Sequence, residues 1–248
     1  MNSTGVALLE PGVNSAGVAC VERGVRWLFA ATLFALVCGV SLPSSADGDA
    51  SACARDALAK VKARYGAVRD FRAGFSQESR SVALGGPGAV TRSRGEVVLA
   101  RPGRMRWSYV EPEPSLVVSD GESLWIYEVG SGEAQKFAVS SSALSAAAVQ
   151  FLLGDADVAE NFAVRAESCE ADRVGVHLTP LQPATYEHLR IIVDPATGEV
   201  SETEVVDLLG NTTRVAFTGV ETNTSPAPST FRFDAPEGVS VIEVTPEP

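Results

Sequence analysis

The sequence is poor in the residues that most often hold metal ions, with two histidines and four cysteines among 248 residues. His177 and His188 are too few and too far apart in the chain for a zinc site, and no cluster of cysteines or carboxylates completes one. The glycine-rich stretch at 85–88 lacks the Lys and the Ser or Thr of a phosphate-binding loop. We therefore expect neither a metal nor another cofactor.

A catalytic constellation is also missing. Ser119, Asp120 and His177 are the residue types of a hydrolase triad, but the sequence has no Gly-x-Ser-x-Gly elbow. Ser119-Asp120-Gly121 is better explained as a hairpin turn. The sequence therefore argues against an enzyme.

Positive charge is scarce. Lys and Arg number 20 against 31 Asp and Glu, which gives a net charge of −11 and a pI near 4.7. A nucleic-acid binder needs a basic face that displaces counterions from phosphates, so this class of protein is excluded. The 22 glycines and 14 prolines follow no period, which rules out collagen and predicts many turns.

The N-terminal region lacks an apolar run long enough to cross a membrane. Residues 27–40 form an uncharged apolar run of 14 residues, whereas a spanning helix needs about 20. Arg23 and Arg26 precede this run and Ser44-Ser45-Ala46 follows it, a pattern typical of a cleaved signal peptide. We expect residues 1–46 to be that peptide, with an uncleaved anchor as the less favoured alternative.

Residues 1–22 carry no signal feature and are a doubtful N-terminal extension, because translation can also start downstream of Met1. Residues 47–248 are expected to form a single, soluble, exported domain. Export would leave Cys53 and Cys169 as one pair in an oxidising compartment, where a disulfide is favoured over two unpaired thiols. The sequence alone does not place their Cα atoms within bridging distance.

Side-chain periodicity predicts one helix followed by many short strands. Leu58, Val61, Tyr65 and Val68 recur every three or four residues, which is typical of an amphipathic helix over 54–68. After Gly74 the period changes to two, as in the alternation of Met105, Trp107 and Tyr109 with polar residues. Further short runs lie at 116–118, 124–127, 136–139, 162–166, 174–179, 189–193, 200–206, 214–220 and 231–233. Short strands without alternating helices predict a meandering antiparallel sheet.

Two apolar features have more than one explanation. Residues 140–154 predict a helix that either packs on the core or covers the mouth of a curved sheet. Trp107, Tyr109, Trp125 and Tyr127 cluster on neighbouring strands, where they either fill a core or line an apolar cavity.

Four blocks of sequence follow one another in an informative order and spacing. They are Phe71-x3-Phe75-x-Gln77; Gly95-Glu96 leading to Arg101-Pro102-Gly103-Arg104-Met105-Arg106-Trp107; Val117-Val118-Ser119-Asp120-Gly121-x2-Leu124-Trp125-x-Tyr127; and Phe231-Arg232-Phe233-x2-Pro236-x-Gly238-Val239. With these blocks the chain resembles the outer-membrane lipoprotein carrier family, LolA, over about residues 54–245.

The resemblance implies a fold and a function. The fold would be mainly β, an incomplete antiparallel β-barrel whose apolar cavity is covered by helices, one of them a lid. The function would be that of a periplasmic chaperone. It would accept lipoproteins from an ATP-driven, ABC-type releasing complex of the inner membrane and carry them to an outer-membrane lipoprotein receptor. We expect a monomer that shields acyl chains and binds no nucleic acid.

The resemblance also implies residue roles. Arg101 would be a latch that donates hydrogen bonds to the lid backbone, since its planar fork carries five donors and stays charged. The alternative is a strand-end arginine that caps carbonyl groups. The expected cavity lining, for which ordinary core positions are the alternative, is Leu58, Tyr65, Met105, Trp107, Val117, Trp125, Phe151 and Leu152. The chain departs from the family at 147–149, where Ala-Ala-Val replaces a frequent Pro before the lid's apolar stretch.

Two other functions stay open at this point. A related fold serves periplasmic sensors that bind a lipid or lipoprotein signal and regulate an anti-sigma factor, although residues 47–248 leave no room for the second domain that such sensors carry. A carrier of free lipids or other amphiphiles is the second alternative, because an apolar hollow accepts acyl chains from either source.

Overall fold

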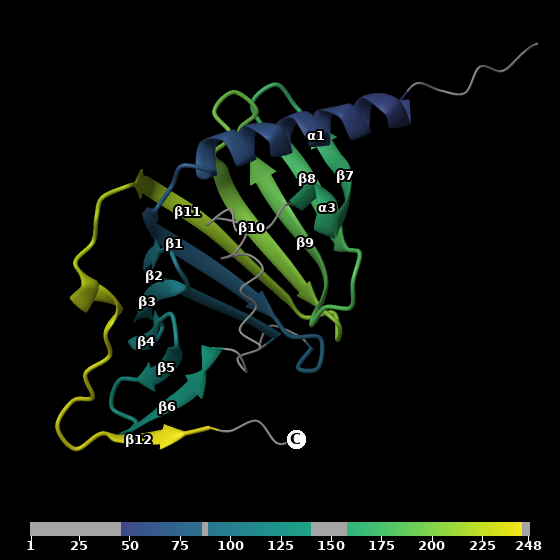
Figure 1. The fold of residues 1–248 in the computed structure, drawn as a ribbon. Helices are drawn as coiled ribbons and strands as arrows, with labels where there is room; N and C mark the ends of the chain where they lie inside the picture. Colours follow the sequence, from purple (N-terminus) through teal and green to yellow (C-terminus); the bar gives the residue numbers. More distant parts are fainter. Residues whose placement is uncertain (1–45, 86–88, 140–157, 245–248) are drawn as a thin grey trace, which may run out of the picture. The chain divides into compact units, whose positions relative to one another are not determined.

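The computed structural model describes residues 46–85, 89–139 and 158–244 (Figure 1). The predicted signal peptide, except for Ala46, and the predicted helix over 140–154 lie outside these residues. In the described part of the chain, no helix is long and apolar enough to cross a membrane.

The described residues form one twelve-stranded sheet with the order β12-β6-β5-β4-β3-β2-β1-β11-β10-β9-β8-β7. Neighbouring strands are antiparallel, except that β12 runs parallel to β6. Strands β12 and β7 are the two edges, so the sheet is open, and it curls (Figure 1). The predicted mainly β fold, an incomplete antiparallel barrel, is confirmed.

The element bounds follow the chain. The strands are β1 Asp70–Arg80, β2 Val90–Ala100, β3 Arg104–Glu111, β4 Ser115–Asp120, β5 Ser123–Glu128, β6 Glu133–Ala138, β7 Phe162–Cys169, β8 Val174–Pro180, β9 Tyr186–Val193, β10 Val200–Asp207, β11 Thr212–Thr222 and β12 Ser240–Glu243. The helical elements are α1 Ala46–Tyr65, the short α3 Val158–Asn161 and the 3-10 helix η3 Pro228–Phe231.

One face of the sheet, called the inner face here, carries the main hydrophobic core. Along β1, Phe71, Ala73 and Phe75 are buried and alternate with more exposed residues. Cross-strand partners point to the same side of a sheet. Phe71 pairs with Leu99 on β2, and Leu99 pairs with Met105 on β3, so all three side chains lie on the inner face. One continuous apolar core results.

Helix α1 packs on the inner face, chiefly against β7 and β8. The periodicity predicted this helix, although it begins earlier, at Ala46, and ends at Tyr65. Leu58, Val61 and Tyr65 are buried in the core. Cys53 and Cys169 form a disulfide that ties α1 to β7.

The C-terminal segment crosses to the outer face of the sheet. Phe231, at the end of η3, is 1% exposed, and the Arg104 guanidinium lies 5.1 Å from the centre of its ring. The prediction of a strand at 231–233 is therefore wrong. Pro228 begins a 3-10 turn instead, closed by the hydrogen bond from Thr230 N to Ala227 O.

The outer face of β7–β11 carries charge instead of apolar side chains. Arg165, His177, Arg190, Glu204 and Arg214 follow one another as cross-strand neighbours. Opposite charges pair along this row, for example Arg214 with Glu204 at 3.0 Å. Along β7–β11 the two faces of the sheet therefore differ sharply in polarity, which fixes the register of these strands.

His177 is the most buried titratable group in this row. It is 9% exposed, and its ring stacks on His188 with the ring centres 4.3 Å apart. Burial lowers the pKa of His177, and the charges of Arg165 and His188 lower it further, while Glu167, 3.4 Å away, acts in the opposite direction.

Acidification should therefore destabilise the fold through His177. Because its pKa is lowered on folding, the unfolded chain takes up this proton first, so the free energy of unfolding falls as the pH drops below about 6.5. Arg190 holds the pKa of Glu167 below its ordinary value despite burial. Protonation of Glu167 therefore lowers the free energy of unfolding as well, but only at a lower pH than His177 does.

Urea unfolding at about pH 7.5 and about pH 5.5 measures this effect. The difference in free energy of unfolding between the two pH values should be smaller in His177→Gln than in the native chain. An equal difference in both proteins would show that His177 does not cause it.

Candidate functional site

Helix α1 leaves part of the inner face half-buried. On β8 and β9, which lie nearer α1, the inward side chains of Val176, Leu178 and Ile191 are fully buried. On β3, the inward side chains of Met105 and Trp107 are half-buried. The difference identifies an apolar surface that the described core packing does not fill.

Three strands contribute to this surface. Trp107 on β3 pairs with Val117 on β4, and Val117 pairs with Ile126 on β5. All three are half-buried. We call Met105, Trp107, Tyr109, Val117 and Ile126 the inner apolar surface. Its members are aliphatic, aromatic and thioether groups, so it can bind an apolar ligand without directional bonds.

An aromatic cluster joins the inner apolar surface to β1. The ring centres of Phe75 and Trp107 lie 4.8 Å apart, and those of Phe75 and Tyr109 lie 5.1 Å apart, both edge to face. The Tyr109 hydroxyl donates to Gln77 Oε1 at 3.1 Å, and burial raises the pKa of Tyr109. The polar end of the ring is thus satisfied while its faces remain available for packing.

Gly95 makes this arrangement possible. A Cβ atom at this position would lie 2.0 Å from the Ser108 carbonyl oxygen and 3.0 Å from the Phe75 ring. Strand β3 and the Phe75 ring therefore approach β2 closely only because this residue has no side chain. The Gly95-Glu96 block consequently has a packing explanation.

Two residues of the predicted cavity lining lie in the packed core. Leu58 and Tyr65 of α1 are 9% and 1% exposed, and Met105 and Trp107 pack against the same cluster. The Tyr65 hydroxyl accepts a hydrogen bond from Val200 N at 3.3 Å, and burial raises the pKa of Tyr65. These residues anchor the helix beside the inner apolar surface.

Trp125 lies on the opposite face of the sheet from the rest of the predicted lining. It pairs with Val118, whereas Val117 pairs with Ile126, and neighbouring residues on a strand point to opposite sides. Its ring stacks on Phe233 with the ring centres 6.3 Å apart. Trp125 is therefore corrected to an outer-face contact, and Ile126 takes the inward place that sequence reasoning missed.

Arg101 lies between the end of α1 and the turn from β2 to β3. Its Nη2 donates to the Tyr65 carbonyl oxygen at 3.4 Å, at the C-terminus of α1. Its own carbonyl oxygen accepts from Arg104 Nη2 at 3.0 Å, and its backbone N donates to Arg69 O. A cation suits a helix C-terminus. The predicted lid partner of Arg101 and the predicted lining residues Phe151 and Leu152 lie outside the described residues.

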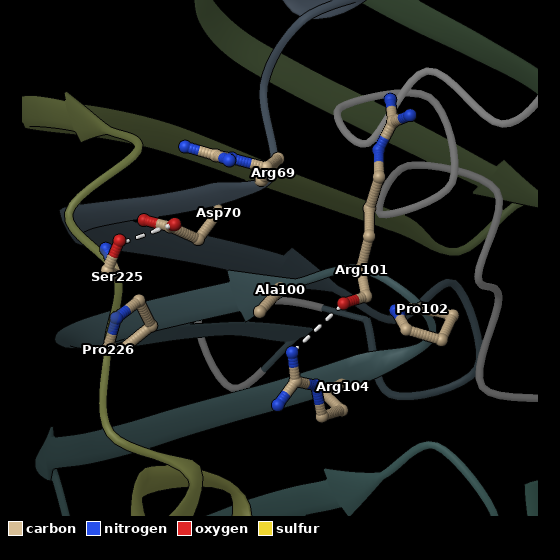
Figure 2. Close-up of a pocket in the computed structure, with 8 residues that line it drawn as sticks. All are labelled: Arg69, Asp70, Ala100, Arg101, Pro102, Arg104, Ser225 and Pro226. Carbon is tan, nitrogen blue, oxygen red and sulfur yellow. Dashed lines mark hydrogen bonds between the residues drawn. The ribbon is translucent and has the colours of Figure 1, made fainter.

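A cleft of about 610 Å³ opens beside Arg101. Figure 2 shows that the guanidinium groups of Arg69, Arg101 and Arg104 point in different directions. The lining residues are Arg69, Asp70, Ala100, Arg101, Pro102, Arg104, Ser225 and Pro226. The Asp70 carboxylate accepts from the backbone N of Thr224 at 2.6 Å and of Ser225 at 3.1 Å. The polar groups of this cleft thus hold the C-terminal segment.

Ser119 and Asp120, which were considered for a catalytic triad, form hydrogen bonds within turns. The Ser119 hydroxyl donates to Gly103 O at 3.2 Å, and Asp120 Oδ1 accepts from the backbone N of Glu122 and Ser123. Both hold tight turns, as the hairpin interpretation proposed. Across the described ranges, no group of three His, Cys, Asp or Glu side chains could hold a metal ion.

Comparison with known proteins gives a consistent family. Residues 67–234 match the family model described as outer membrane lipoprotein carrier protein LolA. A curated relative from Halorhodospira halophila, named outer-membrane lipoprotein carrier protein, is 35% identical over 162 residues, 64% of this chain and 73% of the relative. A relative of the same name from Cupriavidus necator is 31% identical over 177 residues, 71% of this chain and 82% of the relative.

Among solved structures, a LolA superfamily protein from Nitrosomonas europaea is similar, with 12% identity and a TM-score of 0.41. The similarity covers 73% of this chain and 97% of that chain. The assignment rests on the sequence matches, since the family model spans well over half of the chain. This protein belongs to the LolA family of outer membrane lipoprotein carrier proteins, which are carriers and not enzymes.

Proposed function

We propose that this protein is a periplasmic chaperone that shields lipoprotein acyl chains on its inner apolar surface. It accepts its cargo from the ABC-type releasing complex of the inner membrane and passes it to a lipoprotein receptor of the outer membrane. Residues 1–46 direct export, and residues 47–248 are the carrier domain. The observation that carries the proposal is the half-buried row of Trp107, Val117 and Ile126 beside a fully buried core.

The energetics of acyl chains explain why such a surface is needed. Burial of a chain of about 16 carbons is worth on the order of 12 kcal/mol, so a lipoprotein does not cross an aqueous compartment unshielded. The inner apolar surface offsets this cost without covalent chemistry. A carrier must also release its cargo, so its affinity has to stay below that of the acceptor.

We propose that Arg101 keeps the affinity for cargo low by acting as the latch of a lid, the helix predicted over residues 140–154. A lid that must open before cargo binds lowers the net affinity by the free energy of opening. The latch role rests on the family resemblance, whereas the contact of Arg101 with the last carbonyl group of α1 fits the alternative role of a cap.

The two tryptophans of residues 47–248 test where the acyl chain binds, because Trp107 lies on the inner face and Trp125 on the outer face. In a Trp27→Phe background, Trp125→Phe leaves Trp107 as the reporter. A triacylated peptide should shift the emission of Trp107 to shorter wavelength as acyl groups replace water around the indole.

Trp107→Phe in the same background leaves Trp125, whose emission should not change with the same peptide. The peptide without acyl chains should shift neither reporter. A shift of Trp125 alone, or none for Trp107, would contradict binding on the inner apolar surface.

Arg101→Leu should change cargo hand-off and leave the melting temperature nearly unchanged, because the described contact with Tyr65 O is a long one at 3.4 Å. Transfer of acylated peptide from the carrier to acceptor vesicles measures hand-off. The matched control is Arg106→Leu, which removes a contact of the same length to Thr230 O on the outer face and should transfer cargo normally. A large loss of stability in Arg101→Leu would favour a purely structural cap.

A further inference from the structure

Exposed apolar side chains gather at one end of the sheet. Nine large hydrophobic residues of the described chain are exposed, and two of them, Val241 and Ile242, lie on the edge strand β12. The other seven lie in or beside connections between strands: Val82, Leu84, Val110, Val129, Leu181, Leu208 and Leu209. These seven residues belong to five connections, all at the strand ends far from α1. Tyr65 at the end of α1 contacts the first residue of β10, whereas Leu208 follows its last.

Three neighbouring connections form the densest part of this end. The loop after β1 contributes Val82 and Leu84, and the loop after β8 contributes Leu181. The loop after β10 contributes Leu208 and Leu209. Strand pairing places them side by side, because β1 pairs with β11 and β9 pairs with both β8 and β10 (Figure 1). We call these five residues the apolar rim.

Hydrogen bonds fix the turn after β10 and join it to the loop after β1. Asp207 accepts hydrogen bonds from Leu209 N at 2.9 Å and Asn211 Nδ2 at 2.7 Å, which locks the turn and points Leu208 and Leu209 outward at 66% and 77% exposure. Asn211 Oδ1 in turn accepts from Val82 N at 2.9 Å and so joins two of the three loops. A preorganised surface loses little conformational entropy when it binds.

The apolar rim also lacks charge. The loop residues at 81–85, 181–185 and 208–211 contain no Asp, Glu, Lys or Arg, in a chain with a net charge of −11. The Asp207 carboxylate beside them accepts hydrogen bonds from its own turn, which lower its pKa and keep it charged. No charged group of these loops would need to leave water if they entered an apolar phase.

We propose that the apolar rim docks this protein on a lipid bilayer by inserting its five aliphatic side chains among the lipids. Separate projecting loops that bear only Val and Leu suit a deformable lipid surface, whereas protein interfaces centre on Trp, Tyr and Arg. The acidic body is repelled by anionic lipid, so insertion supplies the attraction and favours an uncharged surface. This membrane contact is separate from cargo binding, which takes place on the inner apolar surface.

Co-flotation of the exported chain with phosphatidylcholine vesicles tests the proposal. The native chain should float with the vesicles, and Leu208→Ser/Leu209→Ser should weaken partitioning by about tenfold for each leucine. Added salt should not weaken binding, and an equal admixture of phosphatidylglycerol should weaken it.

The matched control is Val241→Ser/Ile242→Ser, which removes two exposed aliphatic side chains from β12 and should float as the native chain does. The proposal would be overturned if the native chain did not float, or if the two double variants lost vesicle binding equally. Binding only to anionic vesicles would overturn it as well. The Trp107 emission test has an independent outcome, so failure of docking and failure of cargo binding can be told apart.

Discussion

Side chains alternate between the two faces of a single antiparallel sheet, and this alternation decides which residues of the protein pack together. Residues one position apart on a strand face opposite environments: on β9, Ile191 is buried in the core, whereas Arg190 lies in the charged outer row. A register slip of one residue would move the charged outer row of β7–β11 into the core. The polarity of the two faces therefore both selects the fold and creates the apolar surface.

Helix α1 covers only part of the inner face, and the part that it leaves half-buried can bind an apolar ligand. Helix α1 is fixed near one end by the Cys53–Cys169 disulfide and at the other by Tyr65 and Arg101, and the inward side chains of β8 beneath it are buried. The β3–β5 side is left half-buried. The inner apolar surface is apolar enough to hold an acyl chain. It does not depend on a pocket of fixed shape, and this suits a carrier that must release its cargo.

The sequence predicted the larger elements because their periods are strong. The α1 stripe through Leu58 and Tyr65 and the alternation along β3 were both found. Trp125 was misplaced because residues 124–127 are apolar on both faces, so period two gave no signal, and only the pairing of β4 with β5 decides. The sequence could not predict the apolar rim. Its three loops are far apart in the chain, and only the pairing of distant strands brings them together.

Native mass spectrometry of the protein purified from the periplasm of its own host tests whether this chain carries acylated proteins. Proteomics and lipid extraction would identify whatever co-purifies. We expect one acylated protein for each carrier chain. Free lipid without any acylated protein, or an empty chain, would contradict it.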